Sequence, residues 1–172
     1  MEPRSLQDVF RILDEMQSEA VVERFAVVGA VATLFYAETI RTYDLDVAVL
    51  LPAEPSPAGT ILTLRPVYDW LRERGFRPER EHVRIHDVPV QFLSGDPPLW
   101  RDAVESAREF DYEGVKVPVA PPEHLVLMTL EAPSPRRRER GALLVESGAV
   151  DRLQLGRLAA RFGFSLPEAW RA

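Results

Sequence analysis

The 172-residue sequence contains no cysteine, a single lysine (Lys116) and only three histidines. Without cysteine, the chain can form neither a disulfide nor a thiolate metal site. His82, His86 and His124 also lack the spacing of zinc ligands. Any metal that this chain binds is therefore expected to have oxygen ligands.

A long apolar run is missing as well. No stretch is long enough to cross a bilayer, and residues 1–5 lack the charged and apolar regions of a signal peptide. We therefore expect a cytoplasmic protein with no membrane partner. The formal net charge of -6 argues against non-specific nucleic-acid binding, although a local basic patch is compatible with it.

Two carboxylates stand one residue apart at the start of an apolar run, in the segment Arg41 to Leu50. In a β-strand, Asp44 and Asp46 point to one face, about 7 Å apart along the strand. Aspartate is a poor strand former, and two like charges repel each other. The pair therefore indicates either a solvated loop edge or a cation site.

A short buried strand is predicted over residues 25–30, followed by a helix over 31–36. Gly29 and Ala30 stand at the junction. Small residues there let the backbone approach a ligand, and the N–H groups at a helix start favour an anion such as phosphate. A glycine between a strand and a helix is also compatible with a simple turn.

The remaining pattern mixes strands with helices and ends in a helical segment. We expect an amphipathic helix over 5–20, a helix over 61–74, a tight hairpin of strands 82–85 and 88–93, a helix over 99–107, a strand over 115–119, a helix over 125–130 and helices from Gly141 onward. In the second hairpin strand, alternation puts Gln91 on the same face as Pro89 and Leu93. Trp70, Trp100 and Trp170 are interpreted as core or terminal anchors rather than base-stacking platforms, although their spacing does not decide between the two.

The order of these parts resembles the polymerase-β-like nucleotidyltransferase superfamily. It consists of the strand 25–30, a helix, and a strand that starts with Arg41-Thr42-Tyr43-Asp44-Leu45-Asp46. It is most similar to minimal bacterial members grouped with abortive-infection nucleotidyltransferase toxins. The segments 117–125 and 146–151 also resemble theirs. The resemblance implies an α+β fold with a mixed sheet, in which residues 1–120 form the nucleotidyltransferase-like core and residues 121–172 form C-terminal helices packed on it.

The resemblance also implies a chemistry. Asp44 and Asp46 would be the shared Mg²⁺ ligands of a DxD motif, and Gly29 and Ala30 would lie near the phosphates of an NTP. Arg41 and Thr42 would belong to the nucleotide-binding segment. Arg41 is equally compatible with a role as the structural counter-ion of the two carboxylates.

Three departures limit this implication. Active members commonly supply a third carboxylate from a neighbouring strand, where this chain has Gln91, which cannot act as a carboxylate base. Asp87 and Asp96 are candidate substitutes, although both are compatible with turn formation. Ala30 replaces the usual glycine or serine, and the run Arg136 to Arg140 replaces a Lys-Asp pair. That run is either a solvated helix start or a clamp for phosphate or RNA.

Our leading hypothesis from the sequence is Mg²⁺-dependent transfer of a nucleotide from an NTP to a hydroxyl of RNA or protein, with Asp44, Asp46 and Gln91 at the centre. One alternative is a catalytically silent module that binds nucleotide or metal. The other is the toxin component of a toxin–antitoxin pair, in which an antitoxin-like partner protein covers the site.

Overall fold

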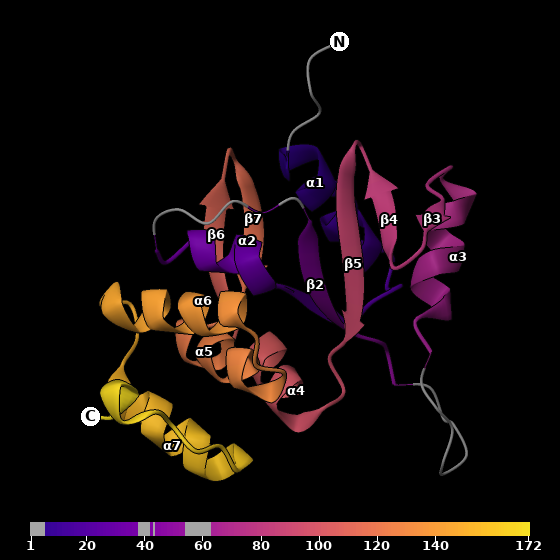
Figure 1. Ribbon diagram of the computed structural model, residues 1–172. Coiled ribbons are helices and arrows are strands. Elements are labelled where there is room, and N and C mark those ends of the chain that lie inside the picture. Colours follow the sequence, from indigo (N-terminus) through magenta and orange to yellow (C-terminus); the bar gives the residue numbers. More distant parts are fainter. Residues whose placement is uncertain (1–5, 38–41, 43, 54–62) are drawn as a thin grey trace.

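The computed structural model describes residues 6–37, 42, 44–53 and 63–172. Helices and strands alternate through most of the chain, and helices alone follow the last strand (Figure 1). The elements are α1 (Leu6–Ser18), β1 (Arg24–Val28), α2 (Gly29–Leu34), β2 (Leu45–Leu50), α3 (Arg65–Glu73), β3 (Pro78–Glu79), β4 (His82–Ile85), β5 (Val88–Ser94), α4 (Pro98–Glu105), β6 (Arg108–Tyr112), β7 (Val115–Val119), α5 (Pro122–Glu131), α6 (Pro135–Glu146), α7 (Arg152–Phe162) and the 3-10 turn η1 (Glu168–Trp170).

The strands form one mixed sheet in the order β3-β4-β5-β2-β1-β7-β6. β1 runs antiparallel to β2, which in turn runs parallel to β5. The hairpin β4–β5 turns at His86 and Asp87, both with positive φ (47° and 70°), as a two-residue hairpin turn requires. The predicted strands and hairpin around the carboxylates are therefore confirmed, and so is the mixed α/β class.

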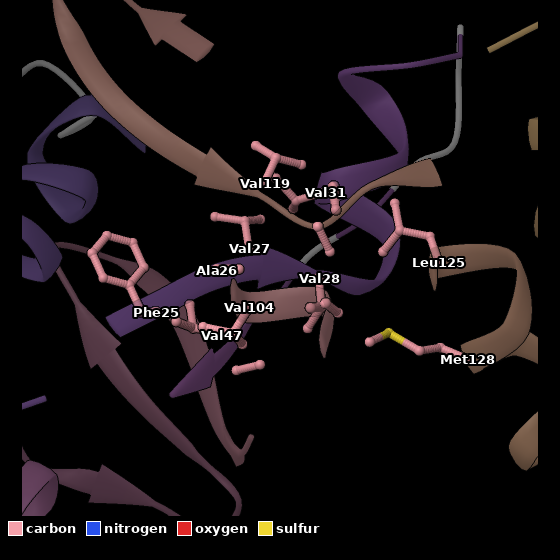
Figure 2. Packing of buried hydrophobic residues seen from close by; sticks show 14 of the residues in the cluster. Phe25, Ala26, Val27, Val28, Val31, Val47, Val104, Val119, Leu125 and Met128 are labelled. Carbon is pink, nitrogen blue, oxygen red and sulfur yellow. The ribbon is translucent and has the colours of Figure 1, made fainter. Parts of the chain in front are cut away.

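The sheet is covered on both faces, so β1 is almost wholly buried. One face carries apolar side chains of β2 and β5, and Tyr68 of α3 packs edge-on against Phe92 there. α3 is also joined to α1, because Trp70 Nε1 donates a hydrogen bond to Glu19 Oε2 at 2.7 Å. Figure 2 shows the core around β1, with Leu125 and Met128 of α5 beside it. The second face is thus the one that the later helices cover.

The helices α4 to α7 gather at one end of the sheet (Figure 1). α5 is the central one, and its residues from Pro122 to Thr129 are all buried. The buried Glu123 carboxylate accepts a hydrogen bond from the Asp151 backbone N–H at 2.8 Å, and Asp151 in turn caps α7. These contacts fix the C-terminal helices against α5.

The sequence-based element boundaries need several corrections. α2 begins at Gly29 rather than Val31, α3 begins at Arg65 because Pro66 favours the first turn, and α6 begins at Pro135 rather than Gly141. Two strands were missed. β6 has exposed charged residues on a sheet edge, and β3 has only two residues.

The division of the chain at residue 120 stays a prediction. Across the described residues, no helix is both long and apolar enough to cross a membrane.

Candidate functional site

A row of three side chains crosses the centre of the sheet on its second face. Asp46 of β2 pairs with Val28 of β1 on one side and with Gln91 of β5 on the other. Side chains in register on neighbouring strands point to the same face. All three line a pocket of about 240 Å³, together with Gly29, Leu93, Trp100, Leu125, Met128, Thr129, Arg137 and Arg140.

Gly29 lies directly against the Asp46 carboxylate. Its φ is +68°, and a Cβ built at this position would overlap Asp46 Oδ2. Two independent constraints, the left-handed backbone and the close approach, therefore require glycine here. The turn from β1 into α2 brings a bare backbone next to the carboxylate, as the small-residue pattern predicts.

Two arginines of α6 form the basic wall of the pocket. Arg137 and Arg140 stand one helical turn apart, so they project from the same side of α6. The Arg140 Nε is buried and has no hydrogen-bond partner among the described residues. Burial holds the pKa of the Arg140 guanidinium below its ordinary value, although the Asp46 carboxylate opposes that shift. The positive charge of Arg140 thus acts on Asp46, although no ion pair joins these two described side chains.

The position of α6 depends on close packing at Gly141. A Cβ there would meet the Trp170 ring at 2.6 Å and the Thr129 Oγ1 at 2.7 Å. The absence of a side chain lets α6 approach α5, and this brings Arg137 and Arg140 over the pocket. The basic wall therefore depends on a helix contact outside the pocket.

Asp46 itself is in an unfavourable environment. Burial, followed by repulsion from Asp44, raises the pKa of Asp46 from 3.8 to about 6, while Arg140, His82 and Arg137 oppose the increase. A cation that binds nearby would stabilise the ionised form of a carboxylate that is buried and next to a second negative charge. The electrostatics therefore favour a cation close to Asp46.

Part of the pocket lining is apolar. Leu93 of β5, Trp100 of α4, and Leu125 and Met128 of α5 form its walls, and Figure 2 shows Leu125 and Met128 extending from α5 beside Val28 of β1. Trp100 Nε1 donates a hydrogen bond to Glu131 Oε2 at 2.8 Å, which fixes the indole. The interpretation of Trp100 as an anchor was therefore incomplete, since the ring also forms part of the pocket wall.

Asp44 faces a second pocket. It lies just before β2 with a side chain that is 47% exposed, and its Oδ2 is 3.4 Å from His82 Nε2. The second pocket, of about 350 Å³, is lined by Asp44, Glu79, His82, Arg84 and Pro89. The two carboxylates of the motif therefore open into two different pockets on the same face of the sheet.

The structure brings together some of the predicted site residues. Gly29, Asp46 and Gln91 share the first pocket, whereas Asp44 lines the second and lies close enough to raise the pKa of Asp46. Ala30 is buried in α2 and does not line the pocket. The Thr42 hydroxyl donates to the Asp44 backbone carbonyl at 3.0 Å and does not line the pocket. Arg41 lies outside the described residues.

The two substitute carboxylates are placed elsewhere. Asp87 stands in the hairpin turn. Asp96 accepts hydrogen bonds from Ser94 and Arg101 at the start of α4. Neither lines the pocket that contains Asp46. The position next to Asp46 is held by the Gln91 amide instead.

Two features of the pocket were not predicted from the sequence. One is which arginines of the run Arg136 to Arg140 face the pocket, and the other is its apolar wall. Arg136, Arg137 and Arg138 are all exposed, and of these three only Arg137 lines the pocket, together with the half-buried Arg140. The i, i+3 spacing of Arg137 and Arg140, and of Leu125 and Met128, was visible in the sequence. Only the packing of α5 and α6 on the sheet shows which side of each helix faces Asp46.

The oxygen groups present suit a Mg²⁺ ion that is also bound by substrate phosphates better than a metal ion bound by protein ligands alone. In the part of the chain that the structure describes, no group of three or more His, Cys, Asp or Glu side chains could hold a metal ion. Mg²⁺ is commonly held by one or two carboxylates together with substrate phosphates. Asp46, with the Gln91 amide on the neighbouring strand and Asp44 two residues earlier in the chain, supplies the one or two carboxylates of that arrangement.

No protein-family model and no curated protein matches the sequence. Solved structures do match. A nucleotidyltransferase-like protein from Paracoccidioides brasiliensis is 14% identical, with a TM-score of 0.53 over 81% of this chain and 73% of that chain. ANT(2'')-Ia, in complex with adenylyl-2''-tobramycin, is 15% identical, with a TM-score of 0.57 over 92% of this chain and 98% of that chain. A solution structure of ANT(2'')-Ia gives a TM-score of 0.51 at 14% identity, over 92% and 91% of the two chains.

The chain has the polymerase-β-like nucleotidyltransferase fold. At these identities, the likeness establishes the nucleotidyltransferase fold alone. The sequence-based assignment of this fold is confirmed by comparisons that cover nearly the whole chain. The more specific similarity to abortive-infection toxins stays a prediction.

Proposed function

We propose that this protein transfers a nucleotide from an NTP to an acceptor hydroxyl in the presence of Mg²⁺, using Asp44 and Asp46. The observation that carries the proposal is the pocket in which Asp46, Gly29, Arg137 and Arg140 meet. Carboxylates that hold a cation and arginines that hold phosphate are the two requirements of phosphoryl transfer.

The roles of the residues follow from their placement. Asp44 and Asp46 would hold Mg²⁺, which when bound supplies charge neutralisation at the phosphates. Arg137 and Arg140 would bind the triphosphate from the opposite side. We assign this role to the arginines rather than to a helix dipole, because α2 has only six residues. Gly29 would let the phosphates approach the carboxylates.

The chemical step is a substitution at the α-phosphorus. The acceptor oxygen forms a bond to that phosphorus, the bond to the bridging oxygen of the β-phosphate breaks, and pyrophosphate leaves. The hydroxyl proton passes to a base or to water. Gln91 cannot accept it as a carboxylate would, so it would orient a water or a ligand instead.

The acceptor class is tested directly. Purified protein is incubated with each of the four NTPs, labelled at the α-phosphate, with Mg²⁺ and with RNA, a protein extract or an aminoglycoside such as tobramycin. RNA and protein are the acceptors that the sequence suggests, and the aminoglycoside represents the adenylylated compound bound to ANT(2'')-Ia. Label should appear in one acceptor class.

Asp44→Asn and Asp46→Asn should each abolish this transfer, because an amide binds Mg²⁺ far more weakly than a carboxylate. The matched control is Asp87→Asn in the hairpin turn, where asparagine also tolerates positive φ. The control should keep wild-type activity. Full transfer by the Asp46→Asn variant would contradict the proposal.

A catalytically silent binding module is the second candidate, and Gln91 favours it. The register places this amide beside Asp46, at the position where active members supply a third carboxylate. Calorimetry that detects Mg·NTP binding, with no label transferred to any acceptor, would identify this function.

A further inference from the structure

We infer that the acceptor is a single-stranded nucleic acid, and that its sugar–phosphate backbone approaches the pocket along α6 by binding the exposed Arg136. This rests on the proposed function and names the acceptor class that the proposed function leaves open. Three features of α6 support it: the direction of its arginines, their lack of ion pairs and their place at the start of the helix.

Arg136 continues the basic wall of the pocket onto the outer surface of α6. It precedes Arg137 directly and Arg140 by one helical turn, so the three side chains project within an arc of about 100°. Arg137 and Arg140 line the pocket that contains Asp46, whereas Arg136 is exposed and lies outside it. A polyanion could therefore contact Arg136 from solvent while its end reaches the pocket.

The carboxylates of the protein do not neutralise these arginines. The chain has 27 acidic and 21 basic residues, yet no ion pair joins Arg136, Arg137 or Arg140 to a carboxylate of the described residues. By contrast, Arg74 and Arg101 each contact two carboxylates. The α6 arginines thus keep their charge available for an external anion.

The place of these arginines at the start of α6 brings no benefit to folding. Ser134 caps the helix, and its first turn contains Arg136 and Arg137 but no acidic residue. The N-terminal end of a helix carries a partial positive charge, so carboxylates stabilise it and cations do not. Binding of a polyanion would turn this arrangement into a favourable one.

A phosphodiester backbone fits these groups better than the other candidate acceptors do. Guanidinium groups bind phosphate oxygens through paired hydrogen bonds. Of its five N–H groups, Arg137 uses one to donate to the Ala132 carbonyl at 3.1 Å. A polycationic aminoglycoside would be repelled by the same side chains. The net charge of -6 disfavours contact of a nucleic acid with the rest of the surface.

The test measures binding of a labelled single-stranded RNA, and of DNA of the same sequence, to the full chain by fluorescence anisotropy at several salt concentrations. Arg136→Gln should weaken binding about five- to tenfold at low salt. It should also reduce the magnitude of the slope of log K against log salt by about 0.7, the change expected for one lost phosphate contact. Its affinity for Mg·NTP and its urea midpoint should not fall.

Arg138→Gln is the matched control, because it removes the same charge from the same helix. Arg138 is exposed and precedes Gly141 by three positions, so it lies on the side of α6 that packs near Trp170, away from Arg136. This variant should keep the salt slope and change the affinity for RNA less than about twofold.

RNA and DNA that bind equally would support the inference, since backbone contacts do not read the sugar, and a preference for one would identify the acceptor further. Equal losses in Arg136→Gln and Arg138→Gln would overturn it, as would a parallel loss of Mg·NTP affinity in Arg136→Gln. A wild-type protein that binds Mg·NTP but neither oligonucleotide, or that labels protein or tobramycin instead, would overturn it and leave the proposed function standing. Failure to bind Mg·NTP as well would overturn both.

Discussion

Asp46 gives the sharpest physical prediction, because the folded chain holds this carboxylate in an environment that disfavours its charge. The pKa of Asp46 is raised from 3.8 to about 6, mainly by burial and then by Asp44. The folded state therefore takes up a proton at Asp46 more readily than the unfolded chain does. Above about pH 6, the ionised carboxylate lowers the stability of the metal-free protein.

Asp46→Asn removes that charge at nearly constant volume. The shift from 3.8 to about 6 corresponds to about 3 kcal/mol, and this is an upper limit because water reaches the carboxylate through the pocket. We expect the variant to be about 1–3 kcal/mol more stable than the wild type at about pH 8. The gain should decline between about pH 6 and pH 3.8, where the wild-type carboxylate becomes protonated in the folded state.

The measurement is urea unfolding of both proteins in EDTA, at about pH 8 and at about pH 5, where linkage leaves roughly half of the full difference. Asp14→Asn on the exposed side of α1 is the matched control and should change stability little at either pH. An Asp46→Asn variant that is less stable than the wild type at the higher pH would refute the reasoning. A gain of the same size at both pH values would also refute it.

Two glycine substitutions test the geometry around the pocket. Gly29→Ala should lower the free energy of unfolding by about 2 kcal/mol or more and remove Mg·NTP binding, because both the left-handed φ and the overlap with Asp46 oppose it. Gly148→Ala is its control: it has a φ of +81° but no atom within 4 Å of the added Cβ, and it should retain nucleotide binding. Gly141→Ala should lower stability by about 1–3 kcal/mol and weaken Mg·NTP binding, because the Cβ pushes α6 away from Thr129 and Trp170. Gly156→Ala, where the Cβ meets open space in α7, should raise stability by up to about 1 kcal/mol. Thermal unfolding measures the stability of these variants, and calorimetry measures their affinity for Mg·NTP. A Gly141→Ala protein with unchanged Mg·NTP affinity would contradict the role given to α6.

The strands at the centre of the sheet could be predicted from the sequence because their signals are local. The apolar run after Asp46, the glycine after β1 and the hairpin at His86 each depend on a few neighbouring residues. The nucleotidyltransferase fold followed from the order of these parts. Alternation identified Gln91 as the polar group that β5 could offer to a site, but its pairing with Asp46 became known only from the register of the strands.

The rest of the pocket depends on packing between distant segments. Trp100 looked like an anchor because a single tryptophan in a helix carries no signal about which side is covered. Arg137 and Arg140 were hidden in a run of similar residues, and only the close contact at Gly141 selects them. β6 was missed although Phe110 and Tyr112 alternate with Glu109 and Asp111, because only these two apolar residues mark the strand.

Several locally unfavourable features meet at this one pocket. Asp46 is an acid with a raised pKa, Gly29 has a left-handed backbone against it, and the Arg140 Nε is buried without a partner among the described residues. A folded chain keeps such features where something other than folding benefits from them. A cation would relieve Asp46, and a polyanion would relieve Arg140. A metal-bound phosphate ligand would supply both kinds of relief at once, and this supports the proposal of nucleotide binding more strongly than either residue does alone.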